Sequence, residues 1–202
     1  MTATIGIYQA YGGTDGNPAS ESPDLSSDST RLQTKDQYNK TDTSYPIPIP
    51  AVGQYNYSYW IHVYLKITGG TYYNVFNVRF YSSGTLGWGN DVTLLRGNRD
   101  SGDKGCPINT GDVQYDLATG TEGTTGHAIA DVSNGHDYYN GQTTKTADVM
   151  SDTAGSPATI DTTGLFEVTG KLKAVVLQTK VGNNASQGVK DDTILTFMYN
   201  EI

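Results

Sequence analysis

The run Ser58-Tyr59-Trp60-Ile61-His62-Val63-Tyr64-Leu65-Lys66-Ile67 decides the fold of this chain. Along an extended backbone, successive side chains point to opposite faces. One face carries Tyr59, Ile61, Val63, Leu65 and Ile67, and the other carries Trp60, His62, Tyr64 and Lys66. The aliphatic stripe with a period of two predicts a β-strand with one buried face.

A second alternating run follows directly. The link Thr68-Gly69-Gly70-Thr71 contains two glycines, which give the backbone the freedom that a tight reversal needs. Residues 73–80 then alternate again, with Phe76, Val78 and Phe80 expected on the inward face. The two runs predict a β-hairpin between Tyr57 and Tyr81.

Length and composition indicate one all-β domain over residues 1–202. The chain has 24 glycines and 7 prolines, 36% of its residues are hydrophobic, and it lacks helix-forming runs of Ala, Leu, Glu and Lys. Such a chain is long enough to bury a core. We expect antiparallel sheets packed as a β-sandwich, with jelly-roll or Ig-like character.

Two long polar segments flank the predicted hairpin. Residues 10–54 are predicted to form an extended arm or a set of edge pieces, in which Pro46-Ile47-Pro48-Ile49-Pro50 is extended without forming a central strand. Residues 82–170 are predicted to form a loop-rich insertion with short strands at 92–95 and 113–117. Structureless connections of this length are uncommon unless a neighbour orders them.

Strong strand patterns return near the C-terminus. Residues 172–180 and 193–199 predict either a second hairpin or two strands in different sheets. Residues 193–199 are largely apolar on both faces, so we expect this strand to lie inside a sheet that is covered on both sides. Accordingly, residues from Thr193 onward are expected to be essential for folding, and residues before Gln54 are expected to be dispensable for the core.

Charge and cysteine content exclude several classes of partner. A net charge of −8 opposes binding to nucleic acid, because affinity for phosphates comes from clustered Lys and Arg. The single cysteine, Cys106, cannot form an internal disulfide. No apolar run is long enough for a membrane span, and no leader pattern is visible, so we expect synthesis and folding in the cytoplasm of a host.

Candidate chemical sites are weak. Residues 96–105 contain close carboxylates and glycines that resemble a calcium loop, but an ordinary turn is preferred because Arg96, Arg99 and Lys104 would repel the ion. The carboxylate pair Asp191 and Asp192 is interpreted as a solvated turn. No catalytic residue, cofactor or metal is expected.

Histidines and the cysteine could be assembled into a zinc or nucleophile site, but their spacings match no known ligand pattern. Loop histidines with ordinary hydrogen bonds are the preferred interpretation, and His62 is assigned to a packed or interface surface. The residues considered for such a site are His127, His136, Asp131, Asp137 and Cys106.

Aromatic residues offer another candidate surface. The chain has 15 tyrosines and 2 tryptophans, whose amphipathic rings suit protein interfaces or stacking on sugars. The alternative is that a second layer of the fold covers them. The residues singled out as a candidate interface or ligand-stacking surface are Trp60, Tyr64, Trp88 and Tyr81.

Several turn motifs resemble a group of small β-rich structural proteins of tailed viruses and proviruses. The resemblance covers most of the chain from about Tyr55 onward. The motifs that carry it are Tyr55-Asn56-Tyr57-Ser58-Tyr59-Trp60, Val78-Arg79-Phe80-Tyr81, Leu86-Gly87-Trp88, Gly97-Asn98-Arg99-Asp100-Ser101-Gly102-Asp103, Gly105-Cys106-Pro107, Ala118-Thr119-Gly120, Gly123-Thr124-Thr125-Gly126-His127, Pro157-Ala158-Thr159-Ile160-Asp161 and 193–202.

The resemblance implies a non-enzymatic virion component, most simply a capsid decoration (cement) protein that stabilises the head shell, and otherwise a neck, tail or fibre part. Its implied partners are the major capsid protein or other virion proteins, with a homo-oligomer expected. No functional residue is implied. The alternative from the residues themselves is a carbohydrate-binding or receptor-binding module that uses Trp60, Trp88 and the tyrosines of the loops as stacking platforms.

Overall fold

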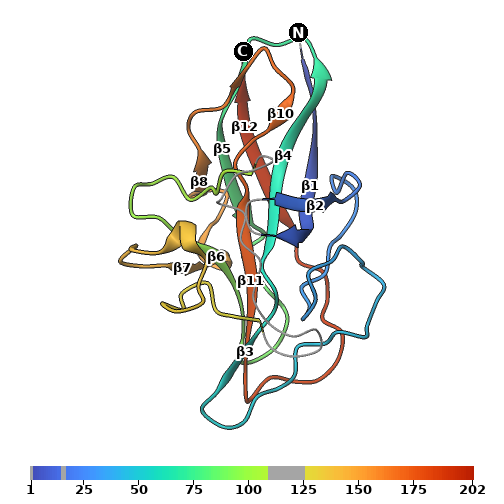
Figure 1. Ribbon diagram of the computed structural model, residues 1–202, viewed down its shortest axis with the longest axis vertical. Coiled ribbons are helices and arrows are strands. Elements are labelled where there is room, and N and C mark those ends of the chain that lie inside the picture. The colour runs from blue at the N-terminus through green and yellow to red at the C-terminus, as the bar shows by residue number, and fades with distance from the viewer. Residues whose placement is uncertain (1, 15–16, 109–125) are drawn as a thin grey trace.

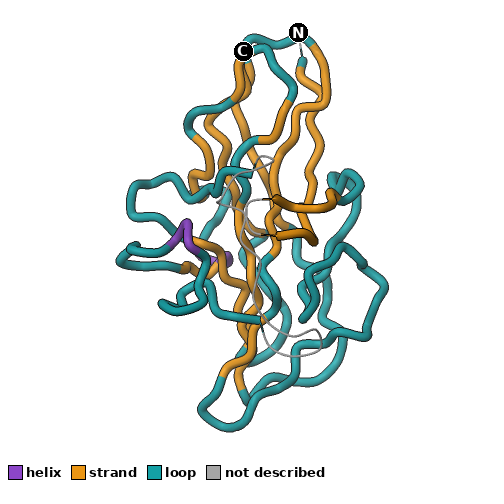
Figure 2. Tube along the Cα trace, viewed as in Figure 1, coloured by secondary structure: helices purple, strands orange, loops and turns teal. Residues whose placement is uncertain are grey.

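The computed structural model describes residues 2–14, 17–108 and 126–202, which form two antiparallel β-sheets around a shared core (Figures 1 and 2). The larger sheet has the order β2-β1-β4-β11-β6-β7, with β10 beside β4 and β3 beside β11. The smaller sheet has the order β12-β5-β8, with β9 beside β5. The all-β, sandwich-like prediction is therefore confirmed.

The strands of each sheet come from widely separated parts of the chain. The strands of the larger sheet are β1 (Ala3–Thr14), β2 (Asn17–Glu21), β3 (Tyr55–Tyr57), β4 (Ile61–Gly70), β6 (Val92–Gly97), β7 (Thr146–Asp148), β10 (Gly170–Lys171) and β11 (Val175–Gly182). Those of the smaller sheet are β5 (Asn74–Ser82), β8 (Ala158–Asp161), β9 (Leu165–Phe166) and β12 (Leu195–Glu201). The described residues also form two single-turn 3₁₀ helices, η1 (Asp137–Tyr139) and η2 (Val149–Ser151).

Strand β4 lies at the centre of the larger sheet and is buried on both faces. Its aliphatic face, which includes Ile61 and Leu65, packs in the main core with Val78 and Phe80 of the smaller sheet. On the opposite face, Tyr64 is fully buried and belongs to a second apolar cluster. Because other segments cover this second face, the predicted strand has two buried faces and not one.

The predicted hairpin is wrong, because β4 and β5 belong to different sheets. Both edges of β4 are already paired: β1 follows it from Ala3 to Ala10, and β11 pairs with its first residues. The chain therefore crosses from one sheet to the other after Gly70, whose φ of 98° suits glycine. Side-chain alternation predicts each strand but does not say which strand pairs with it.

A bulge in β5 changes which residues face inward. Asn77 has a φ of 53°, and the pairing with β8 shifts between Val78 and Arg79. As a result Val75 and Val78 are both fully buried, whereas Phe76 is only partly buried. The prediction is confirmed for Val78 and Phe80 and wrong for Phe76.

The segment predicted as an arm, residues 10–54, packs against the domain. Its beginning completes β1 and forms β2, and no strand occurs between Ser22 and Gln54. Gln33 and Thr34 are nevertheless buried, and the Gln33 carbonyl accepts a hydrogen bond from the Tyr59 amide at 2.9 Å. Residues 46–50 lie outside any strand, as predicted.

The insertion predicted at residues 82–170 contributes to both sheets. It contains β6, β7, β8 and β9 together with η1 and η2. The short strand predicted at 92–95 is present as β6, whereas the one predicted at 113–117 lies outside the described residues. Part of this segment is therefore a structural component of the sandwich.

The C-terminal strand occupies a different position from the one predicted. β11 and β12 lie in different sheets, which was one of the two alternatives, but β12 is the outer strand of the smaller sheet. Phe197 packs edge-on against Phe80 at 5.2 Å between ring centroids, yet it stays only partly buried. β12 is therefore an edge strand, and the expected coverage on both sides is wrong.

Candidate functional site

Two of the four aromatic residues singled out from the sequence lie inside the molecule. Trp60 is 3% exposed, and its indole N–H donates to the His127 carbonyl at 2.9 Å. Tyr64 is fully buried, and its hydroxyl donates to the Glu21 carboxylate at 2.6 Å. Other segments of the chain cover both rings, which was the alternative interpretation. Neither ring is therefore available to a ligand or partner.

The other two, Trp88 and Tyr81, are partly exposed. Trp88 packs against the edge of the main core, and its indole N–H donates to the Asp191 carbonyl at 2.6 Å. Beside it lies an open groove of about 290 Å³. The groove is lined by Gly87, Trp88, Gly89, Ser186, Gln187, Val189, Lys190 and Asp191.

A cluster of two histidines and the cysteine lies beneath the second face of β4. The Nε2 atoms of His62 and His136 are 3.1 Å apart, and these atoms and Cys106 Sγ all lie within 4.8 Å of one another. The three residues are each no more than 1% exposed. We call these three residues the His-Cys-His cluster.

An apolar shell surrounds the His-Cys-His cluster. The Trp60 ring packs against the His136 ring at 5.2 Å between centroids, and the Tyr139 ring lies 5.0 Å from it on another side. Burial lowers the pKa of His62 to about 3, and burial together with the neighbouring His62 holds the pKa of His136 well below its usual value. Both imidazoles are therefore neutral at pH 7, and one can donate its Nε2–H to the other.

Backbone pairing fixes the three residues of the cluster. His62 lies opposite Val176 in the β4–β11 ladder. Cys106 exchanges two backbone hydrogen bonds with Ala174, at 2.7 and 2.8 Å. His136 is the residue before η1, and its carbonyl accepts from the Tyr139 amide at 3.0 Å. The cluster is thus held by rigid main-chain contacts from three distant parts of the chain.

Two of the residues considered from the sequence for a zinc or nucleophile site, Cys106 and His136, lie together in the structure. The third member of the cluster is His62, which the sequence pattern assigns to a packed or interface surface and which is buried. Asp131 instead caps a turn by accepting from the Ser133 and Asn134 amides, and Asp137 accepts from the Asn140 side chain. The only sequence signal for His62 was its place between Trp60 and Tyr64 on the second face of β4.

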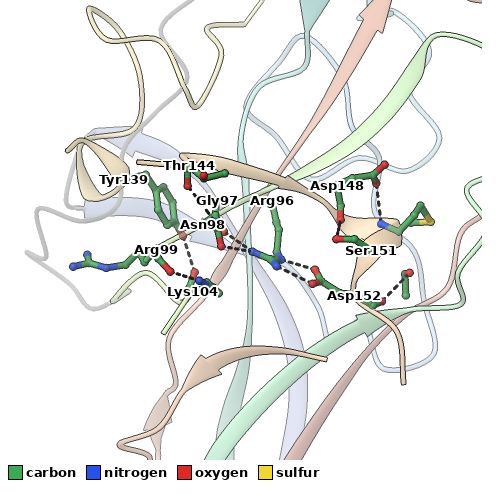
Figure 3. Close-up of polar contacts among 12 residues, drawn as sticks. Arg96, Gly97, Asn98, Arg99, Lys104, Tyr139, Thr144, Asp148, Ser151 and Asp152 are labelled. Carbon is green, nitrogen blue, oxygen red and sulfur yellow. Dashed lines mark hydrogen bonds and ion pairs between the residues drawn. The ribbon is translucent and has the colours of Figure 1, made fainter. Parts of the chain in front are cut away.

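The calcium-like loop at residues 96–105 is a turn whose charged groups have protein partners. Asp100 accepts from the Thr143 amide at 2.9 Å, and Asp103 accepts from the Gly105 amide at 3.0 Å. Arg96 forms a buried two-pronged ion pair with Asp152, in which Nη2 and Oδ1 are 2.7 Å apart (Figure 3). These contacts agree with the preferred interpretation.

An exposed apolar patch lies where β9 and the end of β12 meet the β4–β5 link. The rings of Tyr73 and Phe166 contact edge to face, with centroids 5.8 Å apart, and each is about half exposed. The Tyr73 amide donates to the carbonyl of Ile202 at 2.6 Å. We call Tyr73, Phe166, Val168 and Ile202 the end patch; their exposed fractions are between 53% and 61%.

Comparisons with known proteins give no family for this chain. No protein-family model, no curated protein and no solved structure matches it. Within the described residues, none of the helices has the length and apolar character to cross a membrane.

Proposed function

We propose that the chain is a non-enzymatic structural subunit of a virus particle, most simply a decoration (cement) protein of the capsid shell. The turn motifs that resemble those of small β-rich virion proteins support this function. Decoration requires a rigid body that attaches to a protein surface, and a two-sheet sandwich with a shared core is such a body.

The end patch is the observation that carries the proposal. Exposed apolar side chains gathered in one place mark sites of protein contact, whereas singly scattered ones do not. The patch lies at one end of the long axis of the molecule, near the C-terminus (Figure 1). A subunit with a net charge of −8 and an apolar end is suited to stand end-on on a shell, with its charged sides in solvent.

Binding to particles that lack the chain tests this proposal. The Phe166→Ser/Val168→Ser variant removes two exposed apolar side chains and should weaken binding at least about tenfold. Its melting temperature should stay close to that of the unmodified chain, because both side chains are more than half exposed. Cosedimentation of labelled chain with particles measures the affinity.

The matched control is Val132→Ser/Val52→Ser, which removes two even more exposed valines, 81% and 87%, outside the end patch and the groove beside Trp88. This variant should bind as the unmodified chain does. The proposal fails if the unmodified chain does not bind to the shell, or if the patch variant binds as tightly as the control.

Carbohydrate binding is a second candidate, favoured by the groove beside Trp88. A partly exposed indole next to polar side chains, here Gln187 and Lys190, is suited to stacking and hydrogen bonding with a sugar. A glycan array with the full chain tests it. A sugar ligand that is lost with Gln187→Ala would establish this function, and an array without any binder would exclude it.

A further inference from the structure

We propose that the His-Cys-His cluster binds a thiophilic transition-metal ion with a filled d shell, Zn²⁺ or Cu⁺. Two imidazole nitrogens and one thiolate are ligands that both ions accept, whereas Mg²⁺ and Ca²⁺ prefer oxygen. This site is independent of the end patch and of the proposed attachment to a shell.

The separation of the two imidazoles already matches that of two ligands on one ion. Zinc–nitrogen bonds of about 2.0–2.1 Å in a tetrahedral arrangement place two ligand nitrogens about 3.3 Å apart. The His62 and His136 Nε2 atoms are 3.1 Å apart. Since all three ligand atoms lie within 4.8 Å of one another, Cys106 Sγ needs to move by at most roughly 1.4 Å to complete a three-ligand site.

The position of the cluster favours a metal over a purely structural role. A histidine pair joined by one hydrogen bond needs no thiol, but Cys106 is held beside it by two backbone hydrogen bonds to Ala174. The shell that includes Trp60, Ile129 and Tyr139 keeps the cluster dry, and dry surroundings strengthen metal–ligand attraction. One ion would join three separate parts of the chain: His62 in β4, Cys106 in the loop after β6, and His136 directly before η1.

The charges of the three ligands determine the net charge of the site with each ion. Binding converts the Cys106 thiol to a thiolate and releases one proton per ion, and the imidazole that carries its proton on Nε2 shifts that proton to Nδ1 so that both Nε2 atoms can bind the ion. Two neutral imidazoles and one thiolate carry a charge of −1, so that Cu⁺ gives a neutral buried site and Zn²⁺ gives a charge of +1. Zinc is almost always four-coordinate, so a zinc site here must also admit one water or hydroxide through the apolar shell, whereas Cu⁺ can remain with the three protein ligands.

Metal titration of the full chain tests the proposal. The chain is stripped with a strong chelator under reducing conditions and then titrated with Zn²⁺ or, without oxygen, with Cu⁺. We expect one equivalent of at least one of these ions to bind and to raise the melting temperature. X-ray absorption should show one sulfur at about 2.3 Å in the first shell, with nitrogen at about 2.0–2.1 Å for zinc.

Variants assign the ligands. Cys106→Ser and His136→Asn should each weaken binding by more than about 100-fold, which exceeds the usual effect of a second-shell change. His127→Gln is the matched control, because it replaces the remaining histidine, whose contacts to Trp60 and Gln178 use only its backbone carbonyl. This control should bind like the unmodified chain.

Three results would overturn the metal site: no stoichiometric uptake of either ion, a first shell without sulfur, or unchanged affinity in Cys106→Ser. If the variants do not fold, the absorption measurement on the unmodified chain decides alone. Uptake of Zn²⁺ without Cu⁺, or the reverse, identifies which of the two ions the site holds.

Discussion

At the residue scale, the buried histidines make the metal-free fold sensitive to acid. The pKa of His62 is about 3 in the fold and the pKa of His136 is also strongly lowered, whereas an unfolded histidine titrates near 6.5. Between these values the unfolded chain binds more protons than the folded chain. The free energy of unfolding is therefore highest above about pH 6.5 and falls as the pH drops.

Urea unfolding in the presence of a chelator measures this effect. Each histidine should lower the free energy of unfolding by about 1.2 kcal/mol as the pH falls from about 6 to about 5. Carboxylates with lowered pKa values, such as Glu21, start to contribute only when the pH approaches their unfolded value of 4.5. A stability that is flat from pH 7 to pH 5 would contradict the neutral buried pair.

The same residues show where prediction from sequence ends. The alternation of residues 58–67 identified a strand, but it did not show that His62 would be buried. Its partner His136 lies 74 residues further along the chain. Local patterns carry no information about contacts of this kind, and the ligand spacings that reveal common metal sites are absent from the chain.

At the element scale, the Arg96–Asp152 ion pair ties the two sheets together. Arg96 lies at the end of β6 in the larger sheet, and Asp152 directly follows η2. The Asp152 carbonyl in turn accepts hydrogen bonds from the Ser82 amide and hydroxyl, at the end of β5 in the smaller sheet. Both charged side chains are buried.

Asp152→Ala should therefore be strongly destabilising. It leaves the guanidinium buried without its carboxylate, which typically costs about 3–5 kcal/mol. Asp152→Asn keeps one acceptor and should cost less. Lys40→Ala, which breaks the exposed pair with Asp28, is the control and should leave urea unfolding unchanged. Equal losses of unfolding free energy in Asp152→Ala and Lys40→Ala would contradict a stabilising role for the Arg96–Asp152 ion pair.

β1 should be indispensable for folding, although the sequence alone predicts that residues before Gln54 are dispensable for the core. It lies between β2 and β4, and Ile5 and Ile7 pack against the main core. Removing residues 2–14 would expose one edge of β4 and part of the core, so we expect no folded protein. A soluble product that melts cooperatively, followed by circular dichroism, would show that β1 is peripheral.

Strand existence was predicted better than strand pairing. β4, β6, β11 and β12 all follow alternating or apolar runs that the sequence displays. The prediction of a β4–β5 hairpin was wrong because β1 and β11 occupy the two edges of β4. Their backbone groups form the hydrogen bonds that β5 would have formed. The edge position of β12 could not be predicted, because an apolar strand can lie inside a sheet or at an exposed contact surface.

At the scale of the whole molecule, composition was sufficient for the fold class. Glycine-rich turns, β-branched and aromatic runs and the lack of helical patterns predicted two antiparallel sheets, and these are present. Composition did not predict the end patch, which combines Tyr73, Phe166 and Ile202 from three separate parts of the chain. Such a surface becomes visible only after folding.

The central claim, that the chain is a structural subunit of a virus particle, is tested most directly by its copy number in purified particles. Quantitative mass spectrometry of particles produced from the genome that encodes the chain should find it at a fixed ratio to the major capsid protein. The ratio should persist through density-gradient purification. Absence of the chain from intact particles would contradict the claim.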